Sequence, residues 1–297
     1  VSTVVQLTEN FRLNRDLGEF IQTIYTKSFV PQKQHTRRLA DILENVGDIY
    51  DENDPIVKDA HDILVDLSSA MARRKQLRFE QPRFRNGARG SETSTVLTQL
   101  PRLISLALVR LRVTMQRPEA VGYETHVRGE AHFAAALVRF IRRAAPQERI
   151  FVATPHRIQR HAVREALRSS VDELSEALGG LQLEGDDGAA LGVGDNVTVD
   201  TIERLQGSEA SFVICLFSST YPIGSSTGSL DFLLERRRLN VAISRTRALC
   251  ILVSSNEVLR PPVSVLTNPQ SAKGFAFLKA YEDRAWTTNV TIDLDGL

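Results

Sequence analysis

The feature that most constrains the fold is an alternation of strand-like and helix-like segments that starts near residue 101. The apolar runs LISLALVRLRV, RIFVAT, NVTVDTI, FVICLFS and ALCILVSS predict buried strands. GEAHFAAALVRFIRRAA and IQRHAVREALRSSVDELSEAL have the length and apolar spacing of helices. Strands joined by helix-length crossovers predict an α/β fold, a parallel sheet flanked by helices. Functional sites in such folds gather at the carboxyl ends of the strands.

The first hundred residues do not show this alternation of strands and helices. VSTVVQL predicts a short strand, LGEFIQTIY an amphipathic helix, and ADILENVGDIY and IVKDAHDILVDLSSAM further helices. QLRFEQPRFRNGARGSETS, rich in Arg, Gly and Pro, predicts an exposed connection. We therefore divide the chain into the start of the α/β domain, a helical insertion with its exposed connection, the main α/β domain and a C-terminal tail: 1–30, 31–100, 101–256 and 257–297.

The composition is that of an ordinary globular protein, with 42% hydrophobic and 25% charged residues. The 37 Lys and Arg against 36 Asp and Glu give a net charge of +1, so a polyanionic partner requires a local basic patch. Cys215 and Cys250 each lie inside an apolar run, which predicts two buried thiols in a reducing compartment. No apolar stretch approaches the roughly 18 residues of a membrane span. We expect an intracellular chain, nuclear or cytoplasmic, without a membrane partner.

The segment ATPHRIQR, residues 153–160, is the first stretch that carries chemistry. A predicted strand ends there, and Thr154-Pro155 opens the next helix. The free N–H groups of a helix N-terminus at a strand's carboxyl end are suited to a phosphate. Taken alone, the pattern favours a plain helix cap.

The segment VDTIERLQGSE, residues 199–209, is the second stretch. A strand runs into Thr201, and Gln206-Gly207 predicts a turn before the next strand. Gln206 can donate to a phosphate and Glu209 can accept from a ribose hydroxyl. A polar connection between two strands is an equally good interpretation of this stretch by itself.

The third stretch is LERRRLNVAISRTRALCILV, residues 234–253. If 232–247 is one helix, Arg245 lies on its apolar side, where an arginine is costly unless an anion meets it. A solvated face accounts for Arg236 and Arg237, and Arg238 and Arg247 stay undecided.

Two absences limit what the chain does alone. No glycine is followed by lysine, so the G-x-x-x-x-G-K-[ST] phosphate loop is missing, as is an apolar strand ending in Asp-Glu. The G-x-S-x-G pattern at 224–228 is a decoy, because a hydrolase needs a histidine after the serine and the last histidine is His161. The chain therefore cannot hold and hydrolyse a nucleotide by itself.

Taken in order, these stretches resemble the second RecA-like domain of superfamily-one helicases, in the group of the nonsense-decay helicase and the Okazaki-fragment nuclease-helicase. VDTIERLQGSE is similar to motif V, RRLNVAISRTR to motif VI, and ATPHRIQ to the Thr-Pro-x-x-x-Gln segment. VVQLTENFRLNRDLGEFIQTIY resembles the opening aromatic-Arg motif, with Phe11-Arg12 where the family usually has Tyr-Arg. The resemblance covers about residues 4–30 and 103–256 and implies a RecA-like P-loop NTPase fold that lacks the phosphate loop.

The resemblance implies a role for each matching residue. Arg12 and Arg245 would reach the γ-phosphate of ATP, and Gln206 would sit between the nucleotide and the nucleic acid. Phe11 would stack on the adenine, and Glu209 would accept from the ribose, although 208–211 departs from the family's charged continuation. Thr154-Pro155 and Thr201 would hold the backbone of a single strand. No metal ligand is implied in this chain.

The implied function is that of the C-terminal motor half of an ATP-dependent helicase. ATP and Mg²⁺ would be held mainly by an N-terminal Walker-containing RecA-like domain, in the same or a neighbouring chain, so this chain alone would be inactive. The partner would be single-stranded DNA or RNA. The alternative is a non-catalytic nucleic-acid-binding or protein-interaction module with a degenerate helicase fold, which would not require the two arginines that face ATP.

Overall fold

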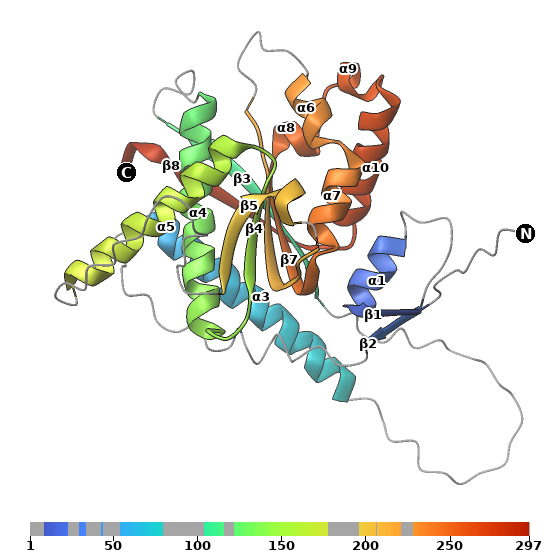
Figure 1. The fold of residues 1–297 in the computed structure, drawn as a ribbon, viewed down its shortest axis with the longest axis horizontal. Coiled ribbons are helices and arrows are strands. Elements are labelled where there is room, and N and C mark those ends of the chain that lie inside the picture. Colours follow the sequence, from blue (N-terminus) through green and yellow to red (C-terminus); the bar gives the residue numbers. More distant parts are fainter. Residues whose placement is uncertain are drawn as a thin grey trace, which may run out of the picture.

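A six-stranded sheet lies at the centre of the protein, in a computed structural model that describes residues 9–22, 30–33, 43, 54–79, 104–115, 122–177, 196–205, 207–220 and 228–296 (Figure 1). The strand order is β5-β4-β6-β7-β3-β8, and all five pairings are parallel. The strands are β3 (Leu106–Thr114), β4 (Ile150–Thr154), β5 (Val197–Thr201), β6 (Ala210–Phe217), β7 (Thr246–Ser255) and β8 (Trp286–Asp293). The predicted α/β, RecA-like fold is confirmed.

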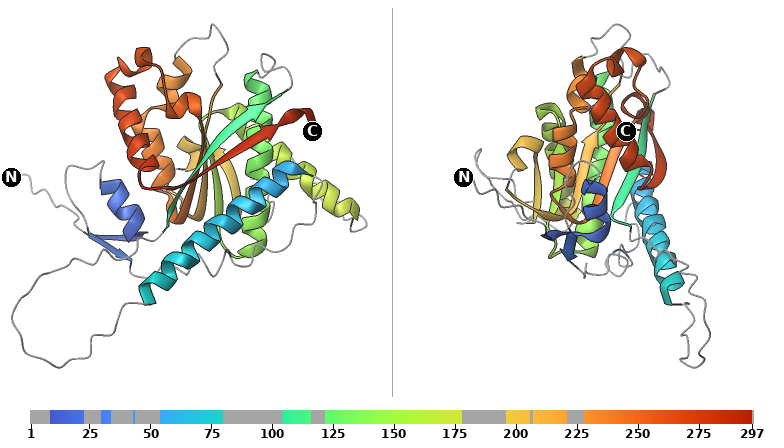
Figure 2. Two further views of the ribbon diagram at one scale, coloured as in Figure 1. Left: turned by 180° about the vertical axis from the view of Figure 1, so that it is seen from behind. Right: turned by 90° about the vertical axis from the view of Figure 1, so that its right-hand side faces the viewer.

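Helices cover both faces of the sheet (Figures 1 and 2). One face packs against α3 (Pro55–Phe79), α4 (Tyr123–Ala144) and α5 (Arg157–Ala177). The other packs against α1 (Arg15–Gln22), α6 (Gly228–Leu233), α7 (Arg236–Ile243), α8 (Asn256–Leu259), α9 (Val263–Leu266) and α10 (Pro269–Glu282). Successive side chains of a strand point to opposite faces, so Phe212 and Ile214 enter one core and Val213 and Cys215 the other.

A small unit precedes the main sheet, at the lower right of Figure 1. β1 (Glu9–Asn14) pairs in parallel with β2 (Val30–Lys33), and α1 follows β1 directly. The Asn14 amide donates to Ser105 Oγ at 2.9 Å, and the Ser105 N–H donates to Asp16 Oδ2 at 2.9 Å. Because Ser105 immediately precedes β3, these bonds hold the unit at the amino end of the central strands.

Some of the features predicted from the sequence are confirmed by the structure, and others are wrong or fall outside the described residues. Both cysteines are free and 0% exposed, with Sγ atoms 3.9 Å apart, which confirms the two buried thiols. The expected helix over 232–247 is wrong: α6 ends at Leu233, Glu235 is extended, and α7 stops at Ile243. The expected exposed connection is wrong at its start, because residues 76–79 belong to α3, and the rest of it lies outside the described residues. The strand at 1–7 and most of ADILENVGDIY and of the loop 224–228 also lie outside them.

The last forty residues add structure to the same sheet. β8 pairs with β3 from Trp286 to Asp293, and α10 packs on the face that α7 also covers. The stretch 257–297, expected from the sequence to be a tail, thus supplies most of α8, the helices α9 and α10, and an edge strand. Among the described residues, no helix combines the length and the apolar character needed to cross a bilayer.

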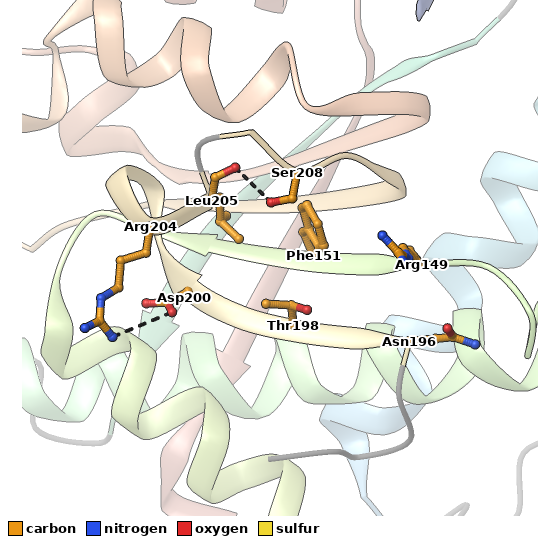
Figure 3. A pocket seen from close by; sticks show the side chains of 8 residues that line it. All are labelled: Arg149, Phe151, Asn196, Thr198, Asp200, Arg204, Leu205 and Ser208. Atoms are coloured by element: carbon orange, nitrogen blue, oxygen red, sulfur yellow. Dashed lines mark hydrogen bonds and ion pairs between the residues drawn. The ribbon is translucent and has the colours of Figure 1, made fainter. Parts of the chain in front are cut away.

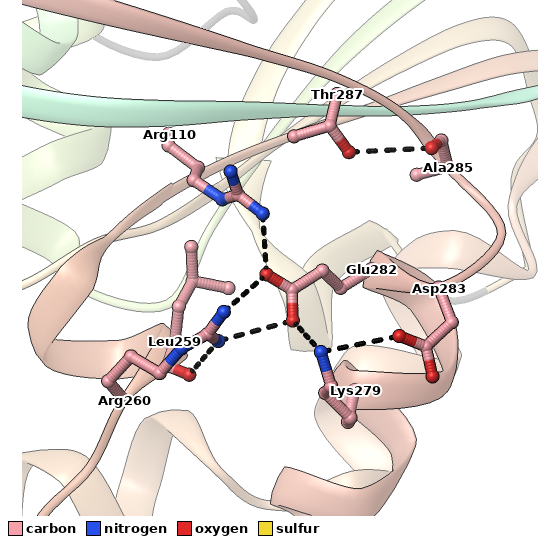
Figure 4. A network of polar contacts seen from close by, with 8 residues as sticks. All are labelled: Arg110, Leu259, Arg260, Lys279, Glu282, Asp283, Ala285 and Thr287. Carbon is pink, nitrogen blue, oxygen red and sulfur yellow. Dashed lines mark hydrogen bonds and ion pairs between the residues drawn. The ribbon is translucent and has the colours of Figure 1, made fainter.

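Glu282 joins α10 to the sheet and to α8, and its side chain is 6% exposed (Figure 4). It accepts from Arg110 at 2.8 Å, from Arg260 at 2.9 and 3.1 Å, and from Lys279 at 2.6 Å. Burial alone would raise the pKa of Glu282, but hydrogen bonds from the three cations outweigh it and lower the pKa to about 2. This carboxylate therefore stabilises the fold only while it is ionised.

We expect Glu282→Gln to lower the free energy of unfolding at pH 7 by about 2 kcal/mol, because three charge-assisted hydrogen bonds are weakened. The native pKa is depressed, so the stabilisation is complete above about pH 4.5 and is lost as the pH falls towards 2. Urea unfolding of both proteins across this range measures the difference. Glu165→Gln, on an exposed part of α5, is the matched control. A difference that stays constant down to pH 2 would contradict the assignment.

Candidate functional site

The segment 202–209 crosses one face of the sheet. β5 ends at Thr201 and β6 begins at Ala210, and because both strands run parallel to β4 the connection must return to the opposite edge. The 3₁₀-helix η2 (Ile202–Leu205) makes the first part of this path, held by the buried side chains of Ile202 and Leu205. Gly207 has a φ of +86°, which favours glycine and confirms the predicted turn. Gln206 lies outside the described residues.

Arg245 and Glu209 lie on neighbouring loops at the amino edge of the sheet. Arg245 is in the turn between α7 and β7, and its carbonyl accepts from Ala210 N at 3.1 Å. Arg247 Nε lies 3.2 Å from Glu209 Oε2, so the undecided Arg247 forms an ion pair with the predicted ribose-binding carboxylate. The expectation that the sites gather at carboxyl ends is therefore wrong for Arg245 and Glu209, which precede their strands.

The strand that carries Phe11 and Arg12 reaches the same amino edge. β1 ends at Asn14, whose amide donates to the Ala248 carbonyl at 3.4 Å, near the start of β7. The backbone of both residues belongs to β1, whereas their side chains lie outside what the structure describes. The structure thus brings the chain segments of three predicted ATP-facing residues, Arg12, Arg245 and Glu209, to one edge.

The predicted nucleic-acid-binding residues meet at the opposite, carboxyl edge. Thr154 and Thr201 are register partners at the ends of β4 and β5. Thr154 is 0% exposed, and its hydroxyl donates to the Asp200 carbonyl at 3.3 Å. Pro155 is also buried, whereas Thr201 is half-buried and its N–H donates to Asp200 Oδ1 at 2.7 Å. Thr201 and the backbone after Pro155 are therefore the more accessible parts of this edge.

A buried polar network holds the turn that follows Thr154. Gln159 accepts from the His156 N–H at 3.3 Å and donates to Glu130 at 2.7 Å. Ser218, which follows β6, donates to the other Glu130 oxygen at 2.6 Å. Burial raises the pKa of Glu130 to about 7, because these hydrogen bonds offset only part of its desolvation. Glu130 thus ties α4, α5 and β6 together beneath the carboxyl edge.

The side chain of Arg238, in α7, contacts both α6 and η2. Its guanidinium lies 3.8 Å from the centre of the Phe232 ring, donates to Glu235 at 2.7 Å and forms an ion pair with Glu203 of η2. The Phe232 ring in turn stacks on His156, with centroids 4.8 Å apart. The undecided Arg238 is therefore a packed residue that joins α7 to the segment 202–209.

A pocket of about 290 Å³ lies between η2 and the exposed face of β5 (Figure 3). Its polar lining comes largely from alternate positions of one strand, since residues 196, 198 and 200 share a face. The lining residues are Arg149, Phe151, Asn196, Thr198, Asp200, Arg204, Leu205 and Ser208. Any group bound there would touch the segment that runs between the two edges.

Comparison with known proteins agrees with this geometry. A family model described as an AAA domain matches residues 1–257. The chain belongs to the AAA domain family. The match supports a helicase-type domain, and the six-stranded parallel sheet is consistent with it. No curated protein matches the chain.

The described part of this AAA domain offers no cluster of three His, Cys, Asp or Glu side chains that would hold a metal ion. Glu209, the acidic residue of the ATP-facing set, contacts Arg247. The described side chains at this edge do not form a metal site.

Sequence reasoning missed several residues of this AAA domain's site. Arg238 could not be placed because its partners Phe232 and Glu203 lie in other segments. Glu130 sits in a helix whose periodicity indicates only a packed face. Asp200 shows one readable signal, because it stands in a predicted strand just before a site residue.

Proposed function

We propose that this chain is the C-terminal motor half of an ATP-dependent nucleic-acid helicase or translocase. One observation carries the proposal: the segment 202–209 links an edge bearing Arg245 and Glu209 to an edge bearing Thr154 and Thr201. A motor needs such a physical connection, because nucleotide state and strand grip must depend on each other.

At the amino edge, the domain would complete an ATP site formed mainly by an N-terminal Walker-containing domain. Bound there with Mg²⁺, ATP supplies the phosphoryl group that is transferred to water. Arg245, with Arg12 from β1, would stabilise the negative charge that spreads over that group. Phe11 would offer its ring to the adenine. Glu209 would accept from the ribose only by sharing its carboxylate with Arg247.

At the carboxyl edge, the domain would hold the backbone of a single strand. The Thr154 hydroxyl already donates to the Asp200 carbonyl of β5. A phosphate at this position would therefore be bound by the backbone N–H groups where α5 begins. Thr201 would add its half-buried hydroxyl. Contacts to phosphates carry no sequence information, which suits a protein that moves along a strand.

The test joins this chain to its Walker-containing half and measures ATP hydrolysis with and without single-stranded DNA or RNA. The proposal predicts hydrolysis that depends on both halves and rises on adding the strand. No hydrolysis, together with strand binding that ignores ATP, would overturn it and would favour the non-catalytic binding module.

A further inference from the structure

A group of arginines extends from the carboxyl edge along α5. Arg160, Arg164 and Arg168 repeat every four residues, which places them on one face of the helix. Arg204 of η2 is close enough to Arg164 to contribute to the lowering of its pKa, after burial and the arginines of α5. We call these four residues the arginine cluster. Its members come from two segments of the chain, α5 before Asp200 in the sequence and η2 after it.

The arginine cluster is poorly neutralised by the side chains that the structure describes. Within the part of the chain that the structure describes, Asp200 is the carboxylate that contacts it, at 2.9 Å from Arg160 and 3.9 Å from both Arg164 and Arg204. Burial and then the neighbouring arginines lower the pKa of Arg164, with Asp200 opposing them. Among the described residues, four cations face one carboxylate, an arrangement that an external anion would stabilise.

Two of the arginines are fixed in place. Arg164 donates from Nε and Nη2 to the Val199 carbonyl at 3.1 and 2.7 Å, and the Arg160 guanidinium is bonded to Asp200. A face that served only solubility would not require such anchoring on β5. Held guanidinium groups lose less side-chain entropy when they bind an oxyanion.

The cluster starts where the predicted strand-binding edge ends. Asp200 accepts from the Thr201 N–H through its side chain and from the Thr154 hydroxyl through its carbonyl. From there α5 carries the charge onwards, and its rise of 1.5 Å per residue spaces Arg160 and Arg168 by about 12 Å. That length is sufficient to meet more than one backbone phosphate.

We propose that the arginine cluster binds backbone phosphates of the single strand held at Thr154 and Thr201, and so extends the strand's path along α5. The proposal rests on the strand-binding part of the proposed function. It adds a contact surface that lies beyond the edge of the sheet and is independent of base sequence.

The test removes two exposed charges, with Arg168→Gln and Arg204→Gln combined in the 297-residue chain. The Arg204 side chain is 67% exposed and Arg168 is also exposed, so the anchored Arg160 and Arg164 and the fold stay intact. The matched control is Arg142→Gln with Arg143→Gln at the end of α4, which removes the same charge at the opposite edge. Fluorescence anisotropy measures binding of labelled oligothymidylates of increasing length over a range of salt concentrations.

We expect the slope of log K against log salt to fall by about 1.4 in the double variant, which is about 0.7 for each lost phosphate contact. Affinity should fall for long oligonucleotides and stay the same for the shortest ones that bind, and the control should match the wild type. An unchanged slope overturns the proposal. An equal loss in the control does so too, since it would indicate a diffuse charge effect.

Two further measurements separate the possible failures. If the double variant loses the same affinity for polyglutamate as for the oligonucleotide, the cluster is a docking surface for acidic proteins, and the proposal is wrong. Strand-stimulated ATP hydrolysis of the complete protein tests the motor separately. If the strand stimulates hydrolysis but the double variant keeps the wild-type salt slope, only the proposal for the arginine cluster is wrong. If the double variant has a reduced slope but the complete protein does not hydrolyse ATP, only the proposed motor function is wrong.

Discussion

Replacing Arg245 with alanine is expected to lower the strand-stimulated ATPase turnover of the complete protein by about 10³-fold or more. A loss of this size corresponds to about 4 kcal/mol of transition-state stabilisation. Arg245 occupies a tight turn between α7 and β7, and its carbonyl accepts a hydrogen bond from the N–H of Ala210, the first residue of β6. The backbone therefore presents the side chain from a fixed position, as a group that stabilises a developing charge requires.

The comparison of kcat with KM makes this test specific. An arginine that acts on the transferring phosphoryl group should lower kcat much more than it raises the KM for ATP. Arg245→Lys keeps the charge without the planar fork and should also turn over slowly. Arg236→Ala, at an exposed position of α7, is the matched control and should turn over normally. Unchanged turnover in Arg245→Ala, with an unchanged thermal melting temperature, would show that Arg245 has no role in hydrolysis.

The strands that the sequence predicts are mostly those buried on both faces, with the edge strand β5 as the exception. β4, β6 and β7 contain the continuous apolar runs IFVA, FVICLF and ALCILV, because parallel strands between two helical layers are covered on both sides. β8 lies at the sheet edge, and its residues alternate between exposed and buried only from Asn289 onwards, so WTTNVTID carries a weak signal. The break between α6 and α7 is not visible in the sequence because Leu234 and Val241 keep a spacing of seven residues, two helical turns, across Glu235.

The stretches of the candidate site can be picked out from the sequence, whereas their arrangement in space cannot. The stretches around Thr154, Thr201 and Arg245 were identified from local patterns, since each follows or precedes an apolar strand. These stretches lie at two opposite edges because the connection 202–209 returns across the sheet. A local sequence pattern does not show to which edge a connection runs. The partners of Arg247 and Arg238 are likewise set by the register of β6 on β7 and by the packing of α7 on η2.

Gly274→Ala is expected to cause the largest loss of stability among the glycine substitutions in the described chain. Gly274 lies in α10, where a Cβ would overlap the carbonyl oxygen of Leu234 and lie 2.5 Å from its carbon. The obstacle is backbone, so no rotamer change relieves it. We expect the free energy of unfolding to fall by about 3 kcal/mol and Tm by about 10 °C.

Two other glycines provide a graded control for this measurement. A Cβ at Gly122 meets nothing within 4 Å, and one at Gly129 meets flexible side chains at 3.3 Å or more. The expected order of destabilisation by alanine is therefore Gly122, Gly129 and then Gly274, measured by thermal and urea unfolding. α10 lies beyond residue 257, where the family match ends, yet its Phe277 stacks on Phe20 of α1 with centroids 4.8 Å apart. If Gly274→Ala unfolds α10 alone and leaves the main transition unchanged, the last forty residues are not part of the same cooperative unit as the sheet.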